Sequence, residues 1–243
     1  MGIKLKSVGL DTSGGLNGAG ATTISGTVTV ASNSQRILIV GYLGRSRTVN
    51  SMTYGGVSMT RYQSSAIFDQ CLTEWWYIVN PAVGSATLTA NLSANSDSRD
   101  FLAYASFYNV DTVNPFVTFV TSTGTAASVS VYLNGTYDNT YMIGGNFNTG
   151  NLSGDAISPA VLFAERDQSD SGGASYLQIT TAANTNTGFN NFSSGSAYSY
   201  LYLELKPAEL DGGGFLYNLI WSWTKEWQNL KKKLKISRKT LTM

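Results

Sequence analysis

Paired carboxylates are the first residues in this sequence whose type and spacing could do chemistry. Glycoside hydrolysis needs two carboxyl groups that face each other across a groove. The close pairs are Asp69 with Glu74 and Glu165 with Asp167. Asp69 and Glu74 are five positions apart, so on a continuous strand they point to opposite faces. Glu165 and Asp167 share a face, but the Asp-Gln-Ser-Asp-Ser-Gly-Gly run that starts at Asp167 is typical of a solvated loop.

The residue types that most often carry catalysis are scarce. Histidine is absent, which removes the commonest general base, the commonest zinc ligand and the usual triad partner of serine or cysteine. The one cysteine, Cys71, lies in a strand-like apolar stretch with no basic neighbour to stabilise a thiolate. We therefore expect Cys71 to be a small buried side chain. The sequence predicts a protein that is not an enzyme, with no catalytic residues, no cofactor and no metal site.

Two further motifs could bind a ligand, and each has a simpler structural interpretation. Asp167, Asp170 and the backbone of residues 172–173 could offer oxygens to calcium, but their spacing is not that of an EF-hand loop. Aspartate and glycine also form ordinary turns. The consecutive aromatic residues 75–77, Trp-Trp-Tyr, could stack on sugar rings if they were exposed. We expect core packing instead, because large aromatic side chains are mostly buried.

Short strands separated by turn residues dominate the first 210 residues. Charged residues make up only 13% of the chain, and Ser, Thr, Asn and Gly take their place, which favours strands and turns over helices. The pattern predicts an all-β, antiparallel β-sandwich of jelly-roll type. The expected strands are residues 22–30, 36–43, 49–53, 57–62, 72–79, 85–92, 101–110, 116–121, 127–133, 141–147, 161–165, 175–180 and 197–205.

Two of these strands are filled on both faces. Residues 36–43, Arg-Ile-Leu-Ile-Val-Gly-Tyr-Leu, are apolar on both faces and suit a central strand. Residues 197–205 carry three tyrosines on one face and three leucines on the other, namely Tyr198, Tyr200 and Tyr202 against Leu201, Leu203 and Leu205. We expect both strands to be buried against other protein on each side.

Turn residues predict how some strands connect. Tyr54-Gly55-Gly56 indicates a tight turn, and Asn134-Gly135 is typical of a two-residue hairpin. Residues 148–158 and 182–196 are long and polar. We expect them to be surface loops, which is where binding residues tend to lie.

A glycine-rich hinge, residues 209–214, separates the β domain, residues 1–208, from a C-terminal segment, residues 215–243. Apolar residues in that segment recur at intervals of 4, 3, 4, 3 and 4, which predicts one amphipathic α-helix. The apolar stripe, with Trp221 beside it, is made of Leu216, Ile220, Trp223, Trp227, Leu230 and Leu234. Basic residues gather at the C-terminal end, where they suit the helix dipole: Lys231, Lys232, Lys233, Lys235, Arg238 and Lys239.

Charge is unevenly divided between these parts. Residues 1–210 hold nine Lys or Arg and 13 Asp or Glu, a net charge of −4, whereas residues 211–243 hold seven and two, a net charge of +5. A short helix beyond a hinge is marginal alone, so its stripe needs a partner. The partner is another copy or protein subunit, a membrane that the Trp residues enter and the Lys residues touch, nucleic acid, or the chain's own sheet. Three Trp within seven residues favour a membrane over nucleic acid.

Several segments together resemble a β-sandwich domain that recurs in bacteriophage structural proteins and some bacterial surface proteins. The most specific are Thr-Tyr-Gly-Gly-Val-Ser-Met-Thr at residues 53–60 and Asn-Pro-Ala-Val-Gly-Ser-Ala-Thr-Leu-Thr at residues 80–89. Ser-Gln-Arg-Ile-Leu-Ile-Val-Gly at 34–41, Ala-Ser-Phe-Tyr-Asn-Val-Asp at 105–111 and Tyr-Leu-Glu-Leu-Lys-Pro-Ala at 202–208 follow the same order. The resemblance covers most of residues 10–208 and carries no catalytic motif. The basic C-terminal segment departs from the pattern.

Together, these features predict a non-enzymatic viral structural protein, from a bacteriophage capsid, decoration or tail. We expect a homo-oligomer, or contacts with other virion proteins, and a virion location. The alternative is a carbohydrate-binding or adhesive module that is extracellular or on a cell surface and binds a glycan. The N-terminus lacks the apolar core of a signal peptide, and no apolar run approaches the roughly 18 residues that span a membrane.

Overall fold

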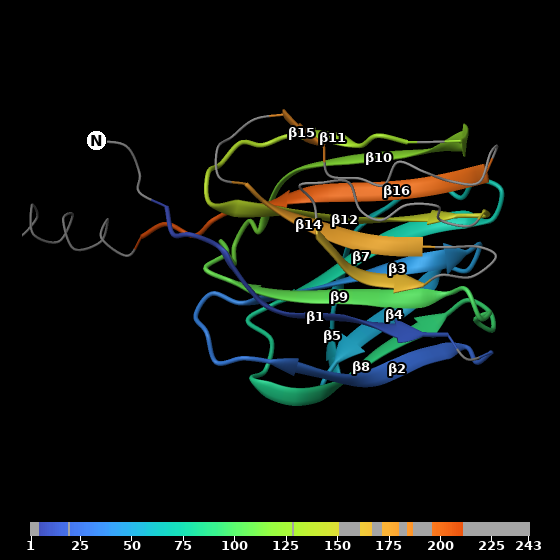
Figure 1. Ribbon diagram of the computed structural model, residues 1–243. Helices are drawn as coiled ribbons and strands as arrows, with labels where there is room; N and C mark the ends of the chain where they lie inside the picture. The colour runs from blue at the N-terminus through green and yellow to red at the C-terminus, as the bar shows by residue number, and fades with distance from the viewer. Residues whose placement is uncertain are drawn as a thin grey trace, which may run out of the picture. The chain divides into compact units, whose positions relative to one another are not determined.

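The computed structural model describes residues 5–18, 20–127, 129–150, 161–166, 172–179, 184–186 and 196–210. The chain divides into two units, Lys6–Ala208 and a second unit made of Met1–Leu5 with Glu209–Met243. In the second unit, Leu5 forms an antiparallel bridge with Glu209. All strands described below belong to the first unit (Figure 1).

Three larger sheets make up the first unit, and every strand pair in them is antiparallel. The central sheet has the order β1 (Gly9–Asn17), β9 (Phe101–Tyr108), β3 (Ile37–Arg45), β7 (Cys71–Val79) and β6 (Thr60–Ser64). The second, here named the tyrosine sheet, has the order β10 (Phe116–Ala126), β16 (Ser196–Leu205), β12 (Thr140–Asn148), β14 (Gly172–Ile179) and β13 (Val161–Arg166). The third, here named the threonine sheet, has the order β2 (Thr23–Val30), β8 (Gly84–Leu92), β4 (Val49–Tyr54) and β5 (Val57–Ser58).

The central sheet lies between the other two, so the unit has three layers and two hydrophobic cores (Figure 1). Alternate residues of β3 enter different cores, because successive side chains on a strand point to opposite faces. Ile37, Ile39 and Leu43 pack toward the tyrosine sheet, whereas Leu38, Val40 and Tyr42 pack toward the threonine sheet. The prediction of a central strand that is buried on both faces is confirmed.

The expected strand over residues 57–62 is two strands in different sheets. Val57–Ser58 forms β5 on the threonine sheet, and Thr60–Ser64 forms β6 on the central sheet. Met59 stands between them, is buried, and donates its backbone N–H to the Met52 carbonyl at 2.9 Å. At this single residue the chain passes from the threonine sheet to the central sheet. The alternation of the sequence does not reveal this change of layer.

The predicted hairpin at Asn134-Gly135 is wrong. The preceding strand is shorter than expected, β11 (Tyr132–Asn134), and it pairs with β15 (Asn184–Asn186) in a separate two-stranded ribbon. Beyond it, the backbone N–H groups of Thr136 and Tyr137 bind the buried Glu204 carboxylate at 2.8–3.0 Å. That contact directs the chain away from a two-residue turn.

Turn chemistry was predicted only where glycine marked it. Gly55 and Gly56 have φ angles of +57° and +79°, which confirms the tight turn after Tyr54. Asp69 and Gln70 form a second turn of positive φ between Phe68 and Cys71, with mutual backbone hydrogen bonds at 3.1 and 2.8 Å. Neither residue is glycine, so no residue type marked this turn in the sequence.

The fold is therefore an all-β antiparallel sandwich, as predicted, with a third layer added. The described residues contain no helix. The predicted helix over residues 215–243 and most of the 209–214 hinge lie outside the described residues.

Candidate functional site

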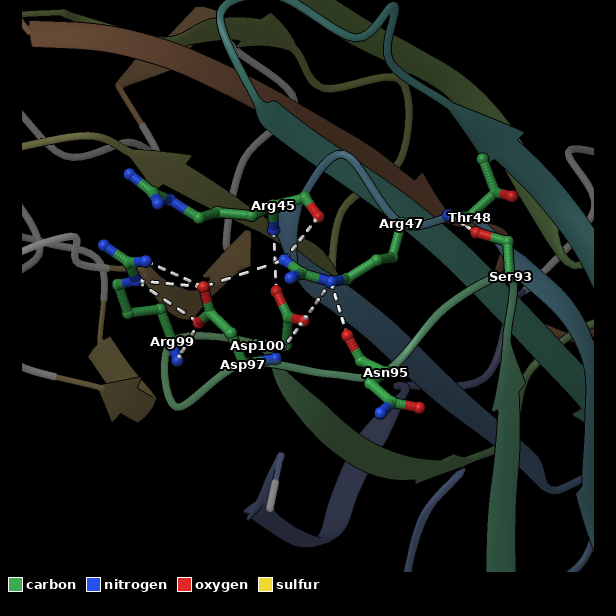
Figure 2. A network of polar contacts seen from close by, with 8 residues as sticks. All are labelled: Arg45, Arg47, Thr48, Ser93, Asn95, Asp97, Arg99 and Asp100. Atoms are coloured by element: carbon green, nitrogen blue, oxygen red, sulfur yellow. Dashed lines mark hydrogen bonds and ion pairs between the residues drawn. The ribbon is translucent and has the colours of Figure 1, made fainter. Parts of the chain in front are cut away.

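A network of polar contacts joins the β3–β4 loop to the β8–β9 loop (Figure 2). Asp100 is fully buried and lies at its centre. The Asp100 carboxylate accepts the backbone N–H of Arg45 at 2.7 Å and of Asp97 at 2.9 Å, and lies 3.5 Å from Arg47 Nε. Two backbone donors and one guanidinium therefore occupy the carboxylate.

The outer members of this cluster are also bound to one another. Arg99 reaches the Asp97 carboxylate at 2.8 Å, and Arg47 Nε donates to the Asn95 carbonyl at 2.7 Å. Partial burial would raise the pKa of Asp97, but the hydrogen bonds and charge of Arg99 hold that pKa below its usual value. Charge-assisted bonds between two loops fix the loop geometry, so we interpret the cluster as structural.

A second buried carboxylate, Glu74, faces the core between the central and threonine sheets. Glu74 Oε2 accepts Trp76 Nε1–H at 3.1 Å and the Val49 backbone N–H at 3.3 Å. Its other oxygen, Oε1, has no hydrogen-bond donor and lies 3.8 Å from the Arg61 guanidinium. Burial raises the pKa of Glu74, although Trp76, Val49 and Arg61 oppose that effect.

Tyr42 is the cross-strand neighbour of Glu74 and is also fully buried. Its hydroxyl lies close to the Asp100 carboxylate. Burial, followed by the nearby Asp100 carboxylate, raises the pKa of Tyr42 above its usual range. Burial also raises the pKa of Asp100. Perturbed pKa values, as at Glu74, Tyr42 and Asp100, can mark a functional site. All three are closed off from solvent by the core, so this group lacks the open groove that acid–base chemistry on a sugar requires.

The predicted carboxylate pairs do not form a catalytic arrangement among the described residues. Asp69 is exposed at the tip of a turn, whereas Glu74 is buried on β7, so the two do not face each other. Asp167 and Asp170 lie outside the described residues, as does the side chain of Glu165. Within the described ranges there is no group of three or more His, Cys, Asp or Glu that could hold a metal ion.

The predicted core roles of Trp75, Trp76 and Cys71 are confirmed. Trp75 is fully buried in the core against the tyrosine sheet, and Trp76 is buried in the core against the threonine sheet. Cys71 is buried, and its thiol donates to the Ala197 carbonyl at 3.3 Å. None of these side chains is placed to stack on a sugar.

An aromatic surface occurs elsewhere, on the side of the tyrosine sheet that faces away from the core. The three leucines of β16 lie in the core, and the opposite face carries the tyrosines, as predicted. Tyr202 is buried, while Tyr198 and Tyr200 are half-buried. The rings of Tyr198 and Tyr200 have centroids 5.9 Å apart and planes only 5° apart. Burial on both sides is thus confirmed for only part of this strand.

Small and polar residues surround this tyrosine pair. Gly124 and Ser122 on β10 are the register partners of Tyr198 and Tyr200, and Asn146 on β12 is the partner of Tyr200 on the other side. Asn146 is 3% exposed, and its Oδ1 has no hydrogen-bond partner. Asn146 was not predicted, although a polar residue at an outward position of an otherwise apolar strand was a visible signal.

The residues predicted to dock on a partner, a membrane or an anionic surface all belong to residues 216–239. They lie outside the described residues, and their placement stays a prediction. In the part of the chain that the structure describes, no helix is long and apolar enough to cross a membrane.

No protein-family model matches the chain, and no curated protein matches it.

Proposed function

We propose that this protein is a non-enzymatic structural protein of a virion, from a bacteriophage capsid, decoration or tail. The observation that supports this most is that the buried carboxylates bind backbone N–H groups of the protein itself. Asp100, Glu74 and Glu204 each accept backbone N–H groups from another loop or strand, and they do so inside closed packing. Such groups rigidify a scaffold and do not present chemistry to a substrate.

The resemblance of residues 10–208 to sandwich domains of bacteriophage structural proteins points the same way. The jelly-roll type of the sandwich belongs to this proposal, as does the C-terminal helix of residues 215–243. In the proposal, the Trp-lined stripe docks on a partner subunit or a membrane, and the Lys cluster faces an anionic surface. The protein would then form a homo-oligomer or bind other virion proteins.

Electron microscopy of the purified full-length chain, with its mass measured by light scattering, tests this proposal. Rings, tubes or shells of fixed symmetry are the expected result. The matched variant ends at Leu210 and should lose those assemblies if the C-terminal segment carries the subunit contact. A full-length chain that stays monomeric at every concentration, alone and with a membrane present, would rule out a self-assembling virion component.

The alternative function is a carbohydrate-binding or adhesive surface module. It is favoured by one specific observation, the pair of half-buried parallel tyrosine rings on the tyrosine sheet. Binding of the purified chain to an immobilised glycan, with no ordered assembly in the microscope, would favour this alternative over the first proposal.

A further inference from the structure

We propose that the outward face of the threonine sheet binds ice, through rows of hydroxyl-bearing side chains that hold water in the positions of a crystal lattice. The threonine sheet is an outer layer of the first unit, so one of its faces is turned away from the core (Figure 1). The site goes beyond the function proposed above and does not depend on assembly into a virion.

Regular alternation in β2 and β8 separates a core face from a hydroxyl-bearing face. The core residues of the two strands are Ile24, Val28, Val30, Leu88, Ala90 and Leu92. Because successive side chains on a strand point to opposite faces, the alternate residues point outward. These outward residues are Thr23, Ser25, Thr27, Thr29, Ser85, Thr87, Thr89 and Asn91. The packed core face fixes the backbone on which they stand.

The register of the sheet brings the outward side chains into rows that run across the strands. From one end of the sheet to the other, the rows are Thr23 with Asn91 and Ser51, Ser25 with Thr89, Thr53 and Ser58, Thr27 with Thr87, and Thr29 with Ser85. In any sheet, neighbouring strands lie about 4.8 Å apart and alternate residues of one strand about 6.7 Å apart. The hydroxyl groups therefore repeat in two directions.

This array is open to water and well ordered. Ser25, Thr27 and Thr87 are exposed, although they belong to strands whose other face is buried. In the end row, the hydroxyl oxygens of Thr29 and Ser85 are hydrogen-bonded at 2.7 Å. A β-branched threonine has few side-chain rotamers, so its hydroxyl and methyl groups keep fixed positions on the sheet.

Ice matches such an array in both chemistry and repeat. Its water molecules form a hydrogen-bonded lattice, and the surface of that lattice repeats in two directions on the same length scale as a β-sheet. A threonine hydroxyl both donates and accepts hydrogen bonds, so it can take the place of a lattice water. The methyl group beside it restricts the orientation of the neighbouring water molecules. Ice contacts the whole face at once, whereas a small molecule needs a concave pocket.

The composition of the rows disfavours other ligands. The rows contain no cation for a phosphate or sulfate group, and no aromatic ring on which a sugar or a base could stack. They also contain no large apolar anchor of the kind that fills the centre of a protein interface. An uncharged, hydroxyl-bearing sheet face fits a lattice of water better than nucleic acid, a sugar or a second copy of the chain.

The test grows ice slowly on a cooled probe in a solution of the full-length chain and measures how the protein divides between the ice and the remaining liquid. Growing ice excludes a protein that does not bind it, so the wild type should be retained well above a reference protein of similar mass. Thr87→Tyr, inside the array, should lose that retention, because the projecting ring holds ice away from the neighbouring hydroxyls. Thr125→Tyr, at an exposed position of β10, is the matched control and should be retained like the wild type. Tyrosine suits a strand, and circular dichroism establishes that each variant folds.

Three outcomes would overturn the site. A wild type that is excluded from ice like the reference protein has no ice-binding face. Equal retention of Thr87→Tyr and the wild type would place any ice contact elsewhere on the chain. Equal loss in Thr87→Tyr and Thr125→Tyr would show a general effect of the added ring and no role for this face. If Thr87→Tyr does not fold, Thr27→Tyr, in the same row on the edge strand β2, carries the test with the same expected loss.

Discussion

Trp75 and Trp76 are adjacent in the chain, yet their side chains lie in different hydrophobic cores on opposite faces of β7. Each indole N–H donates a hydrogen bond within the core that holds its ring. Trp75 Nε1 donates to the Leu201 carbonyl at 2.9 Å and ties the central sheet to the tyrosine sheet. Trp76 Nε1 donates to Glu74 Oε2 at 3.1 Å within the other core. Through these two side chains, β7 of the central sheet packs against the tyrosine sheet on one face and the threonine sheet on the other.

Trp75→Ala should lower the free energy of unfolding by about 3–5 kcal/mol, because a large aromatic side chain leaves a cavity in a closed core. Trp75→Phe should lower it by about 1–3 kcal/mol, since part of the ring remains but the donor to Leu201 is lost. Urea denaturation followed by circular dichroism measures both. Thr87→Ser, on the exposed face of the threonine sheet, is the control and should stay within about 0.5 kcal/mol of the wild type. A Trp75→Ala effect as small as the control would contradict the buried placement.

The buried Glu74 predicts a pH dependence of stability. Burial raises the pKa of Glu74 above its ordinary value of 4.5, so the folded state prefers the protonated form. Its contribution to stability is therefore fully present below about pH 4.5 and is lost as the pH rises through the folded-state pKa. Glu74→Gln stays neutral and avoids this loss.

The measurement is the difference in unfolding free energy between Glu74→Gln and wild type from pH 4 to pH 8. This difference should grow in favour of Glu74→Gln as the pH rises, because only the wild-type side chain must become charged in the core. Asp97 and Asp111 have lowered pKa values and contribute with the opposite sign, but they are present in both proteins and cancel. A difference that does not change with pH would mean that Glu74 titrates normally.

Asp100→Ala should destabilise the protein by about 2–5 kcal/mol, because the backbone N–H groups of Arg45 and Asp97 lose their acceptor inside the fold. Thermal unfolding measures this. Asp69→Ala is the matched control, since that carboxylate is exposed at a turn. Equal melting temperatures for the two variants would show that the loop network does not hold the β3–β4 and β8–β9 loops together.

Cys71 should be unreactive in the folded protein. Its side chain is fully buried and its thiol donates to the Ala197 carbonyl. A thiol reagent such as a maleimide should therefore label the native chain orders of magnitude more slowly than the chain in denaturant, where the thiol is free. Labelling at similar rates in both conditions would place Cys71 at the surface.

The C-terminal segment should bring the chain to anionic vesicles if the membrane form of the proposed docking holds. Full-length protein should pellet with vesicles that contain phosphatidylserine, and a chain without residues 212–243 should remain in the supernatant. Replacement of Lys231, Lys232 and Lys233 by Gln should weaken pelleting, by about 1 kcal/mol for each charge near the surface. Equal pelleting of the full and truncated chains would remove a membrane role for this segment.

The sequence predicted local features that depend on neighbours along the chain. The alternation of residues 36–43 and 197–205 predicted which side chains share a face, and Gly55-Gly56 predicted a turn, because strand periodicity and positive φ are properties of short segments. The apolar run around Trp75 predicted core packing, which the structure confirms.

The outward face of the tyrosine sheet was only half visible in the sequence. The three tyrosines of β16 were placed on one face by their spacing alone. Asn146 is about 50 positions from Tyr200 and reaches it only through the register of β12 and β16. That register pairs strands that are far apart in the chain, so no pattern within a short segment predicts it.

By itself, the sequence determined that the part of the chain the structure describes is all-β, that Leu201 and Tyr200 point to opposite sides of their strand, and that charge separates the body from the C-terminal segment. Only the tertiary structure decided that three sheets form two cores, that Met59 passes from one layer to another, and that Asp100 and Glu74 are enclosed. The physical reason is that side-chain alternation is set by the backbone of one strand. Sheet order, layering and burial depend on contacts between residues far apart in the chain, whose free energies a local pattern does not encode.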